Sequence, residues 1–236
     1  NMAQVPSLGS PYGKECRACW TVPEGYKLVG IDASGLELRM LAHYMKDEDF
    51  KNEILHGDVH SANQRLAGLE SRNQAKTFIY ALLYGAGDEK LGSVVGGNKR
   101  DGAKLRKHFF DNLPAFKHLK DSVSRAASKG FLKGLDGRKL YVRSEHAALN
   151  TLLQSAGAIV MKQAMVNLNQ AIRLNTLDAN FVCNVHDEWQ LEVKESQADS
   201  TGQLGVDAIK QAGKELELFC SLDGEYKIGD NWSETH

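Results

Sequence analysis

The sequence lacks long apolar runs and a second closely spaced cysteine pair, and these absences exclude several classes of protein. No stretch approaches the roughly 18 apolar residues of a membrane helix, and the first four residues lack the charged-then-apolar order of a signal peptide. Cys16 and Cys19 have the spacing of half a zinc knuckle, but no second Cys or His pair completes it, so we expect reduced thiols. We therefore expect a soluble, intracellular protein without a membrane partner.

Charge is balanced overall but unevenly distributed. The net charge is −1, yet residues 1–186 contain 25 basic and 18 acidic residues, whereas residues 187–236 contain 4 and 12. Basic residues cluster at Lys99, Arg100, Lys104, Arg106, Lys107, Lys133, Arg138, Lys139 and Arg143. Such clusters are typical of a polyanion-facing surface, but solvated helix faces would look the same.

Apolar patterns predict an α+β fold. A strand over 26–31 ends at Asp32 and a helix follows Gly35, while strands over 181–185 and 189–193 flank the acidic turn His186-Asp187-Glu188. Residues 58–129 are mostly helical in pattern. A hairpin around Asp136-Gly137, a long helix over 149–172 and a helix from about 198 to 219 follow. We expect an antiparallel sheet domain with an inserted helical subdomain.

Asp32 and Asp187 each follow a strand-like run. Two rigidly held carboxylates suit a pair of Mg²⁺ ions, and the carbonyl of Ala33 adds an uncharged ligand. Taken singly, an Asp after a strand is more often a turn or cap residue. Only the combination with a cationic helix favours phosphoryl transfer.

That helix is predicted around residues 72–84. Its apolar positions Ala75, Phe78, Ile79 and Leu82 form one stripe, and Arg72, Lys76, Tyr80 and Tyr84 follow an adjacent face. Arg72 and Lys76 suit phosphate binding, Lys76 also suits protonation of departing pyrophosphate, and Tyr80 offers a ring to a base or sugar. Periodicity alone favours an amphipathic surface helix, with Arg72 and Lys76 in water.

Polar residues elsewhere are weaker candidates. Asn150 and Gln154 lie one turn apart on the long helix, where amides suit minor-groove acceptors, and His60 and His186 suit phosphate or nucleotide edges. Each of these residues has an ordinary structural explanation as well. The glycines around 92–99 do not match a phosphate loop, which excludes a P-loop ATPase.

Three strings in order resemble the motifs of family A (Pol I-like) DNA polymerases. They are Asp32-Ala-Ser-Gly-Leu-Glu-Leu-Arg39, Arg72-x₃-Lys76 followed by Tyr84-Gly85, and Val185-His-Asp-Glu188. The strings Gly57-Asp-Val-His60, Gly134-Leu-Asp-Gly-Arg-Lys139 and Leu149–Ala158 resemble the bacteriophage replicative branch in particular. The resemblance covers essentially the whole chain.

The resemblance implies a role for each matching residue. Asp32 and Asp187 would hold two Mg²⁺ ions, with Mn²⁺ as an alternative, and Glu188 would support them. Glu37 would exclude the ribose 2′-hydroxyl. The triphosphate of the incoming dNTP would be bound by His60, Arg72 and Lys76, with Lys76 also the general acid.

The same resemblance places contacts to the bases and to the primer–template. Tyr80 stands where the family has Phe or Tyr, and Tyr there is associated with acceptance of dideoxynucleotides. Tyr84 would abut the templating pair, while Asn150, Gln154 and His186 would check primer–template geometry. Arg39 would be a structural partner in its helix.

The implied organisation is palm (1–45 and 131–236) and fingers (46–130). A thumb or exonuclease portion, or a processivity factor, would be a separate partner, and the site of action would be the cytoplasm of the infected host cell. The predicted function is DNA-directed DNA polymerisation in phage replication. Two alternatives stay open: a catalytically weak fragment that binds nucleotide or primer–template, and a two-metal nuclease, in which Arg72, Lys76 and Tyr80 would have no task.

Overall fold

The computed structural model describes residues 2–235 and contains two compact units. The first, here called the sheet unit, comprises residues up to Leu36 and from Gly157 onward; the second, the helical unit, comprises Glu37–Ala156. Across residues 2–235, no helix has the length and apolar character needed to cross a membrane. Each unit is described by itself.

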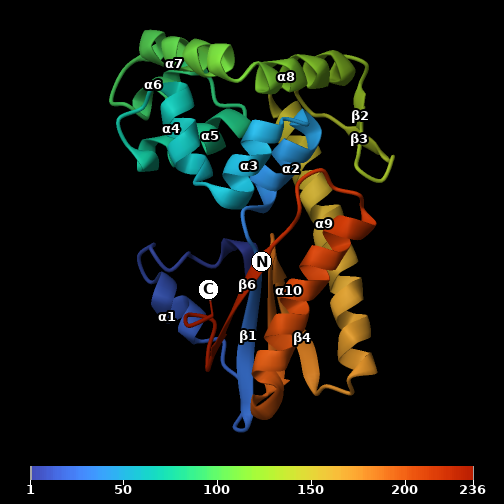
Figure 1. The fold of residues 1–236 in the computed structure, drawn as a ribbon. Coiled ribbons are helices and arrows are strands. Elements are labelled where there is room, and N and C mark those ends of the chain that lie inside the picture. The colour runs from blue at the N-terminus through green and yellow to red at the C-terminus, as the bar shows by residue number, and fades with distance from the viewer. Residues whose placement is uncertain (1, 236) are drawn as a thin grey trace. The chain divides into compact units, whose positions relative to one another are not determined.

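The sheet unit is built on four antiparallel strands in the order β4-β5-β1-β6 (Figure 1). Its strands are β1 (Tyr26–Ala33), β4 (Ala179–Val185), β5 (Glu188–Lys194) and β6 (Gly224–Gly229). Its helices are η1 (Met2–Gln4), α1 (Gly13–Ala18), η3 (Glu195–Gln197), α10 (Ala198–Glu215) and most of α9 (Ala148–Leu174). The arrangement confirms the predicted α+β class with an antiparallel sheet.

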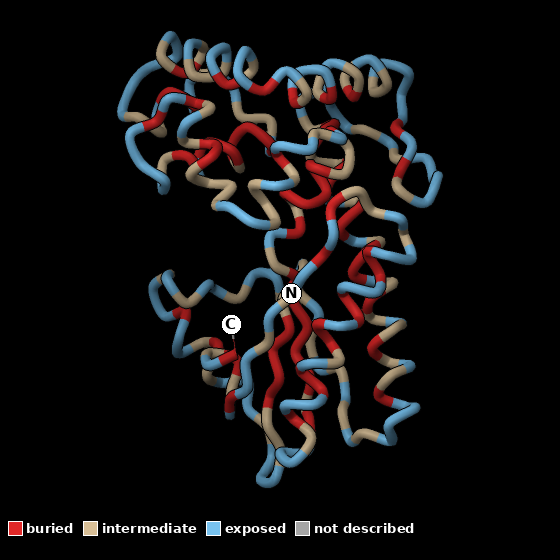
Figure 2. The backbone as a smooth tube through the Cα atoms, in the orientation of Figure 1, coloured by how far each residue is buried: buried red, intermediate tan, exposed pale blue. Residues whose placement is uncertain are grey.

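The two faces of β1 have different neighbours. Val29, Ile31 and Ala33 are buried on the face covered by α10, where Gly205 allows close approach: a Cβ there would lie 2.3 Å from Cδ1 of Ile31. Gly30 and Asp32 alternate onto the opposite face. In Figure 2, much of the backbone of the sheet has the red colour of buried residues. Asp32, one of the two predicted metal ligands, therefore lies on the face that α10 does not cover.

The helical unit consists of short helices and one hairpin. Its elements are α2 (Leu36–Met45), α3 (Glu48–His56), α4 (Val59–Ala67), α5 (Arg72–Leu83), α6 (Asp88–Ser93), α7 (Lys99–Asn112), α8 (Pro114–Ala127), β2 (Phe131–Lys133), β3 (Lys139–Tyr141), η2 (Glu145–Ala147) and the first part of α9. Phe78, Phe109 and Phe116 form its aromatic core, with successive ring centroids 5.5 Å apart in edge-to-face pairs.

The last helix is shorter than predicted. We expected it to reach about Phe219, but α10 ends at Glu215. The N–H of Leu218 bonds to the carbonyl of Gly213, and Glu217 adopts a positive φ of 49°. This C-terminal cap, with a residue in the left-handed conformation, provides a hydrogen-bond donor to a carbonyl of the last turn and ends the helix.

The division into units does not coincide with the predicted palm and fingers boundaries. The helical unit begins at Glu37 and ends at Ala156, whereas the resemblance to polymerase motifs placed the fingers at 46–130. The two units are defined by how compactly the backbone packs, whereas palm and fingers were placed by resemblance to polymerase motifs, so the two divisions of the chain need not agree. The palm and fingers assignment stays a prediction.

Candidate functional site

Three acidic residues, Asp32, Asp187 and Glu188, lie at one end of the sheet. Asp32 lies directly opposite Glu188 in the β1–β5 pairing, and Asp187 occupies the two-residue turn between β4 and β5. The N–H of Ala33 donates to the carbonyl of Asp187 at 3.1 Å, which ties the turn to the end of β1. His186, beside it in the turn, is exposed and has a positive φ of 55°. The two predicted metal-binding acids are thus brought together.

The electrostatics of Asp32 show how concentrated this negative charge is. Burial, followed by the neighbouring carboxylates of Asp187, Glu188 and Glu225, raises the pKa of Asp32 from 3.8 to about 7, while Lys227 acts in the opposite direction. A carboxylate in such surroundings gains from a nearby cation, because the cation offsets both the desolvation and the repulsion.

Glu188 is a deeply buried acid, with 4% exposure. Its Oε1 accepts hydrogen bonds from Nε1 of Trp232 at 2.8 Å and from Nε2 of Gln190. Oε1 of Gln190 in turn accepts from the hydroxyl of Thr235 at 2.7 Å. The C-terminal segment therefore fixes the position of Glu188 beside Asp32, which fits a supporting role.

The donor set suits a hard divalent cation. Mg²⁺ takes oxygen ligands and is commonly held by one or two carboxylates together with water and substrate phosphate. Within residues 2–235 no group of three or more His, Cys, Asp or Glu side chains is positioned to hold a metal ion. Asp32 and Asp187 would accordingly supply only part of a coordination shell, with the carbonyl of Ala33 as a further oxygen.

The predicted cationic helix is α5. Ser71 caps its N-terminus in a reciprocal capping box with Gln74, which fixes where the helix begins. The guanidinium of Arg72 forms two hydrogen bonds to Asp58, from Nε at 2.6 Å and from Nη2 at 3.1 Å. These bonds also hold the pKa of the Asp58 carboxyl well below its usual range. Arg72 is therefore oriented by an acid from α4's N-terminus.

His60 and Tyr80 approach each other on neighbouring helices. Their ring centroids are 6.2 Å apart, and burial together with the charges of Arg72 and Lys76 lowers the pKa of His60. Nδ1 of His60 is buried and has no hydrogen-bond partner among the described residues. The lowered pKa means that protonation of this imidazole is less favourable than in free histidine. Lys76 is exposed on the same helix as Tyr80.

Glu37 and Tyr84 form a second group in the helical unit. The hydroxyl of Tyr84 donates to Oε1 of Glu37 at 2.9 Å. Burial and this bond raise the pKa of Tyr84 to about 12, while a hydrogen bond with Gln154 acts in the opposite direction. Tyr84 is nevertheless 51% exposed, so its ring is accessible. Asn150 lies one turn before Gln154 on α9 and is half-buried.

The predicted site residues thus fall into two structural groups. Asp32, Ala33, His186, Asp187 and Glu188 belong to the sheet unit; Glu37, His60, Arg72, Lys76, Tyr80, Tyr84, Asn150 and Gln154 belong to the helical unit. Arg39 is buried, at 8% exposure, as expected of a structural residue.

Sequence reasoning missed three supporting residues. Asp58 carries a detectable signal, because it stands two residues before His60 in a string that resembles the phage branch. Gln190 and Trp232 reach Glu188 from the strand and from the C-terminal segment. No local pattern predicts the second of these contacts, since Trp232 is 44 residues away from Glu188.

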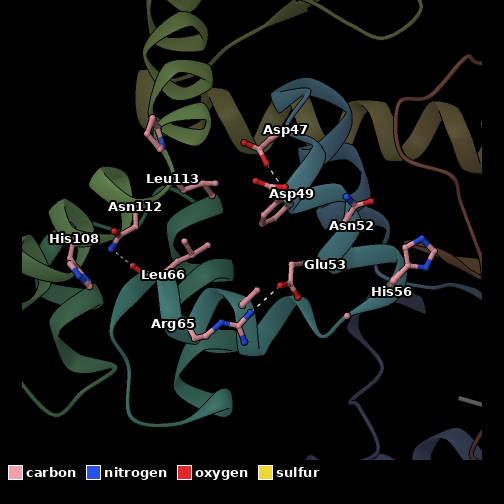
Figure 3. A pocket seen from close by; sticks show the side chains of 14 residues that line it. Asp47, Asp49, Asn52, Glu53, His56, Arg65, Leu66, His108, Asn112 and Leu113 are labelled. Carbon is pink, nitrogen blue, oxygen red and sulfur yellow. Dashed lines mark hydrogen bonds and ion pairs between the residues drawn. The ribbon is translucent and has the colours of Figure 1, made fainter.

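A large cavity lies elsewhere in the helical unit (Figure 3). It measures about 1010 Å³ and is lined by residues that include Asp49, Glu53, His56, Arg65 and His108. None of the predicted site residues lines it.

Comparison with known proteins decides the family. The family model described as DNA polymerase family A matches residues 1–234. The chain belongs to DNA polymerase family A. Curated relatives include the DNA-directed DNA polymerases of Enterobacteria phage T3 and Escherichia phage T7, each 40% identical over the whole chain. The chain spans 38% of the length of each of these relatives.

Bacterial family A members are more distant but also match across the chain. DNA polymerase I of Pseudomonas aeruginosa is 28% identical over 100% of the chain and 28% of its own length. Among solved structures, the POL domain of Pol1 from M. smegmatis, in complex with DNA primer-template and dNTP, has a TM-score of 0.89 and 26% identity. The match covers 100% of this chain and 45% of that one. Membership of family A and the α+β polymerase-domain fold are therefore both established.

Proposed function

We propose that this chain is the polymerising core of a phage DNA-directed DNA polymerase, which adds dNMPs from dNTPs to a primer 3′ end by two-metal nucleotidyl transfer. The arrangement that carries the proposal is Asp32 opposite Glu188 in the sheet, with Asp187 in the adjoining turn. The phage relatives support the replicative role, and the M. smegmatis structure supports primer-template DNA and dNTP as the substrates.

In the sheet unit, Asp32 and Asp187 would hold the two Mg²⁺ ions, with the Ala33 carbonyl as a third protein oxygen. Bound divalent ions would neutralise charge on the attacking and leaving oxygens. Glu188 would stay beside Asp32 because Trp232 and Gln190 bind its carboxylate. His186 would contact the primer–template from the same turn.

In the helical unit, α5 would bind the incoming triphosphate. Arg72 would contact phosphate oxygens with the guanidinium donors that Asp58 does not use, and His60 would donate one hydrogen bond. Lys76 would hold the proton that passes to departing pyrophosphate. The ring of Tyr80 would lie against the nucleotide.

Sugar and base recognition would involve the residues around Glu37. Because the hydroxyl of Tyr84 binds Oε1 of Glu37, the carboxylate is held in one position, where it would crowd a ribose 2′-hydroxyl. Asn150 and Gln154 would read minor-groove acceptors common to correct base pairs.

Primer extension tests the proposal. The chain is mixed with a labelled primer–template, dNTPs and Mg²⁺, alone and with a separately expressed thumb fragment of the T7 relative. Asp187→Asn should lower the extension rate at least about a hundredfold, because a metal ligand contributes several kcal/mol in the transition state. Asp207→Asn removes an exposed carboxylate of α10 and serves as the matched control.

The outcomes separate the remaining alternatives. Extension that disappears in Asp187→Asn but persists in Asp207→Asn supports the polymerase. Binding of dNTP and Mg²⁺ without extension, even with the thumb fragment, would favour a binding fragment. Cleavage of the DNA in the absence of dNTPs would favour a nuclease.

A further inference from the structure

The hairpin of β2 and β3 presents an unusual outer face. Phe131 pairs with Tyr141 and Lys133 with Lys139 in its antiparallel register. Residues two apart on a strand share a face, so all four side chains lie on the same side of the hairpin. We call this set the hairpin face.

The opposite side of the hairpin anchors it to the helical unit. Leu132 is buried at 3% exposure, Leu140 is half-buried, and β2 packs against α8. The hairpin projects beside α8 in Figure 1. Because the leucines face inward, the register forces both rings and both ammonium groups of the hairpin face outward.

Core packing does not account for the two aromatic rings. Tyr141 is 79% exposed and Phe131 is 38% exposed. Nζ of Lys139 lies 4.9 Å from the centroid of the Phe131 ring, so one face of Phe131 already carries a cation. The Tyr141 ring is the more open of the two. The hairpin face therefore leaves the Tyr141 ring open to a ligand, next to two lysines.

The charges of the hairpin face are available to a ligand. Lys133 and Lys139 form no ion pair within the described part of the chain. Arg138 differs, because it is held by Asp136 in the turn and stabilises the hairpin itself. The two lysines therefore offer positive charge that no carboxylate of residues 2–235 pairs with.

We propose that the hairpin face binds single-stranded DNA, with an unpaired base stacked on Tyr141 and neighbouring phosphates on Lys133 and Lys139. Stacking on an exposed ring needs a base that has left the duplex, which favours a single strand over a double helix. A polyanionic backbone complements the two lysines. The inference rests on the proposed function only for the identity of the strand, the unpaired template.

Fluorescence anisotropy with labelled oligo-dT tests the stacking contact. Without Mg²⁺ or dNTPs, Tyr141→Ala should weaken binding at least about fivefold, in keeping with the stacking contribution of one base. Tyr141→Phe retains the ring and should stay within about twofold of the wild-type chain. Tyr12→Ala, which removes an equally exposed tyrosine of the sheet unit, should leave binding unchanged.

Salt dependence tests the phosphate contacts. The double variant Lys133→Ala/Lys139→Ala should reduce the slope of log affinity against log salt by about 1.4, because each phosphate of a single strand that a lysine neutralises adds roughly 0.7 to the slope. Lys107→Ala/Lys117→Ala removes the same charge from lysines already paired with Asp111 and Asp121, so its slope should change less.

Three results would overturn the inference. The first is an unchanged affinity for oligo-dT in Tyr141→Ala. The second is a loss of affinity for a matched duplex in Tyr141→Ala that is as large as the loss for oligo-dT. The third is a salt-dependence slope that falls as much in Lys107→Ala/Lys117→Ala as in Lys133→Ala/Lys139→Ala. Circular dichroism and thermal melting of each variant establish that the hairpin still folds. If binding to oligo-dT depends on Tyr141 but primer extension fails, the surface assignment stands and the polymerase proposal falls. If primer extension succeeds and Tyr141→Ala binds oligo-dT as tightly as the wild-type chain, the polymerase proposal stands and the assignment of the hairpin face falls.

Discussion

Replacing Asp32 with Asn in metal-free buffer should stabilise the fold at alkaline pH. Burial and three neighbouring carboxylates raise the pKa of Asp32 to about 7, so the ionised side chain is unfavourable in the folded protein. Asn has nearly the same shape but no charge. The expected gain is in the free energy of unfolding, although the same substitution removes a proposed metal ligand.

The size and pH range follow from proton linkage. A pKa of about 7 in the folded chain against 3.8 corresponds to about 4 kcal/mol, at roughly 1.4 kcal/mol per pKa unit. Because Asp32 is partly solvent-exposed, screening should reduce this to about 1–3 kcal/mol. Below about pH 4 the carboxyl is protonated in both states and Asn has no advantage. The wild-type chain loses this stability as pH rises from about 4 to 7, so the difference is largest above pH 7.

Urea denaturation with EDTA at pH 8.5, 6 and 4 measures the difference in the free energy of unfolding between the variant and the wild-type chain. In thermal unfolding under the same conditions, the melting temperature should shift by roughly 2–4 °C per kcal/mol. Asp207→Asn, an exposed change in the same unit, is the control and should show no such pH dependence. A variant that is less stable than the wild-type chain at pH 8.5, or equally stabilised at pH 4, would refute the electrostatic reasoning.

Three further changes probe two hydrogen bonds of the structure and one proposed contact to the nucleotide. Trp232→Phe keeps a ring but removes the N–H donor of the buried Glu188 carboxylate, which should cost about 1.5–3 kcal/mol in urea denaturation. Tyr84→Phe releases Glu37 and should increase incorporation of ribonucleotides relative to dNTPs in primer extension, with less than about 1 kcal/mol lost from stability. If Tyr84→Phe and the wild-type chain select dNTPs over ribonucleotides equally well, the hydrogen bond between Tyr84 and Glu37 has no part in sugar recognition. Tyr80→Phe should increase rejection of dideoxynucleotides, and unchanged terminator use would argue against its proposed contact.

Local signals were sufficient for most of the secondary structure. Alternation and apolar runs predicted β1, β4 and β5, and the 3.6-residue period predicted α5 with Ala75, Phe78, Ile79 and Leu82 buried. The hairpin around Asp136-Gly137 was confirmed for the same reason: its turn chemistry is encoded within a few residues. The turn is not the tight primed type that is typical of Asp-Gly, because Gly137 has a positive φ of 83° but Asp136 does not. The exact end of α10 was not predicted correctly, because a non-glycine residue, Glu217, adopts the left-handed conformation that ends the helix.

The sequence by itself determined the family, the α+β class and the identity of the candidate acids and cations, because motifs and periodicity are properties of neighbouring residues. Only the tertiary structure decided which of them interact. The opposition of Asp32 and Glu188 depends on strand register, and the hydrogen bond from Trp232 to Glu188 depends on where the C-terminal segment crosses the sheet. Likewise, Asp58 reaches Arg72 only through packing of α4 against α5. Such long-range contacts arise from chain closure and burial, which no short window of sequence contains.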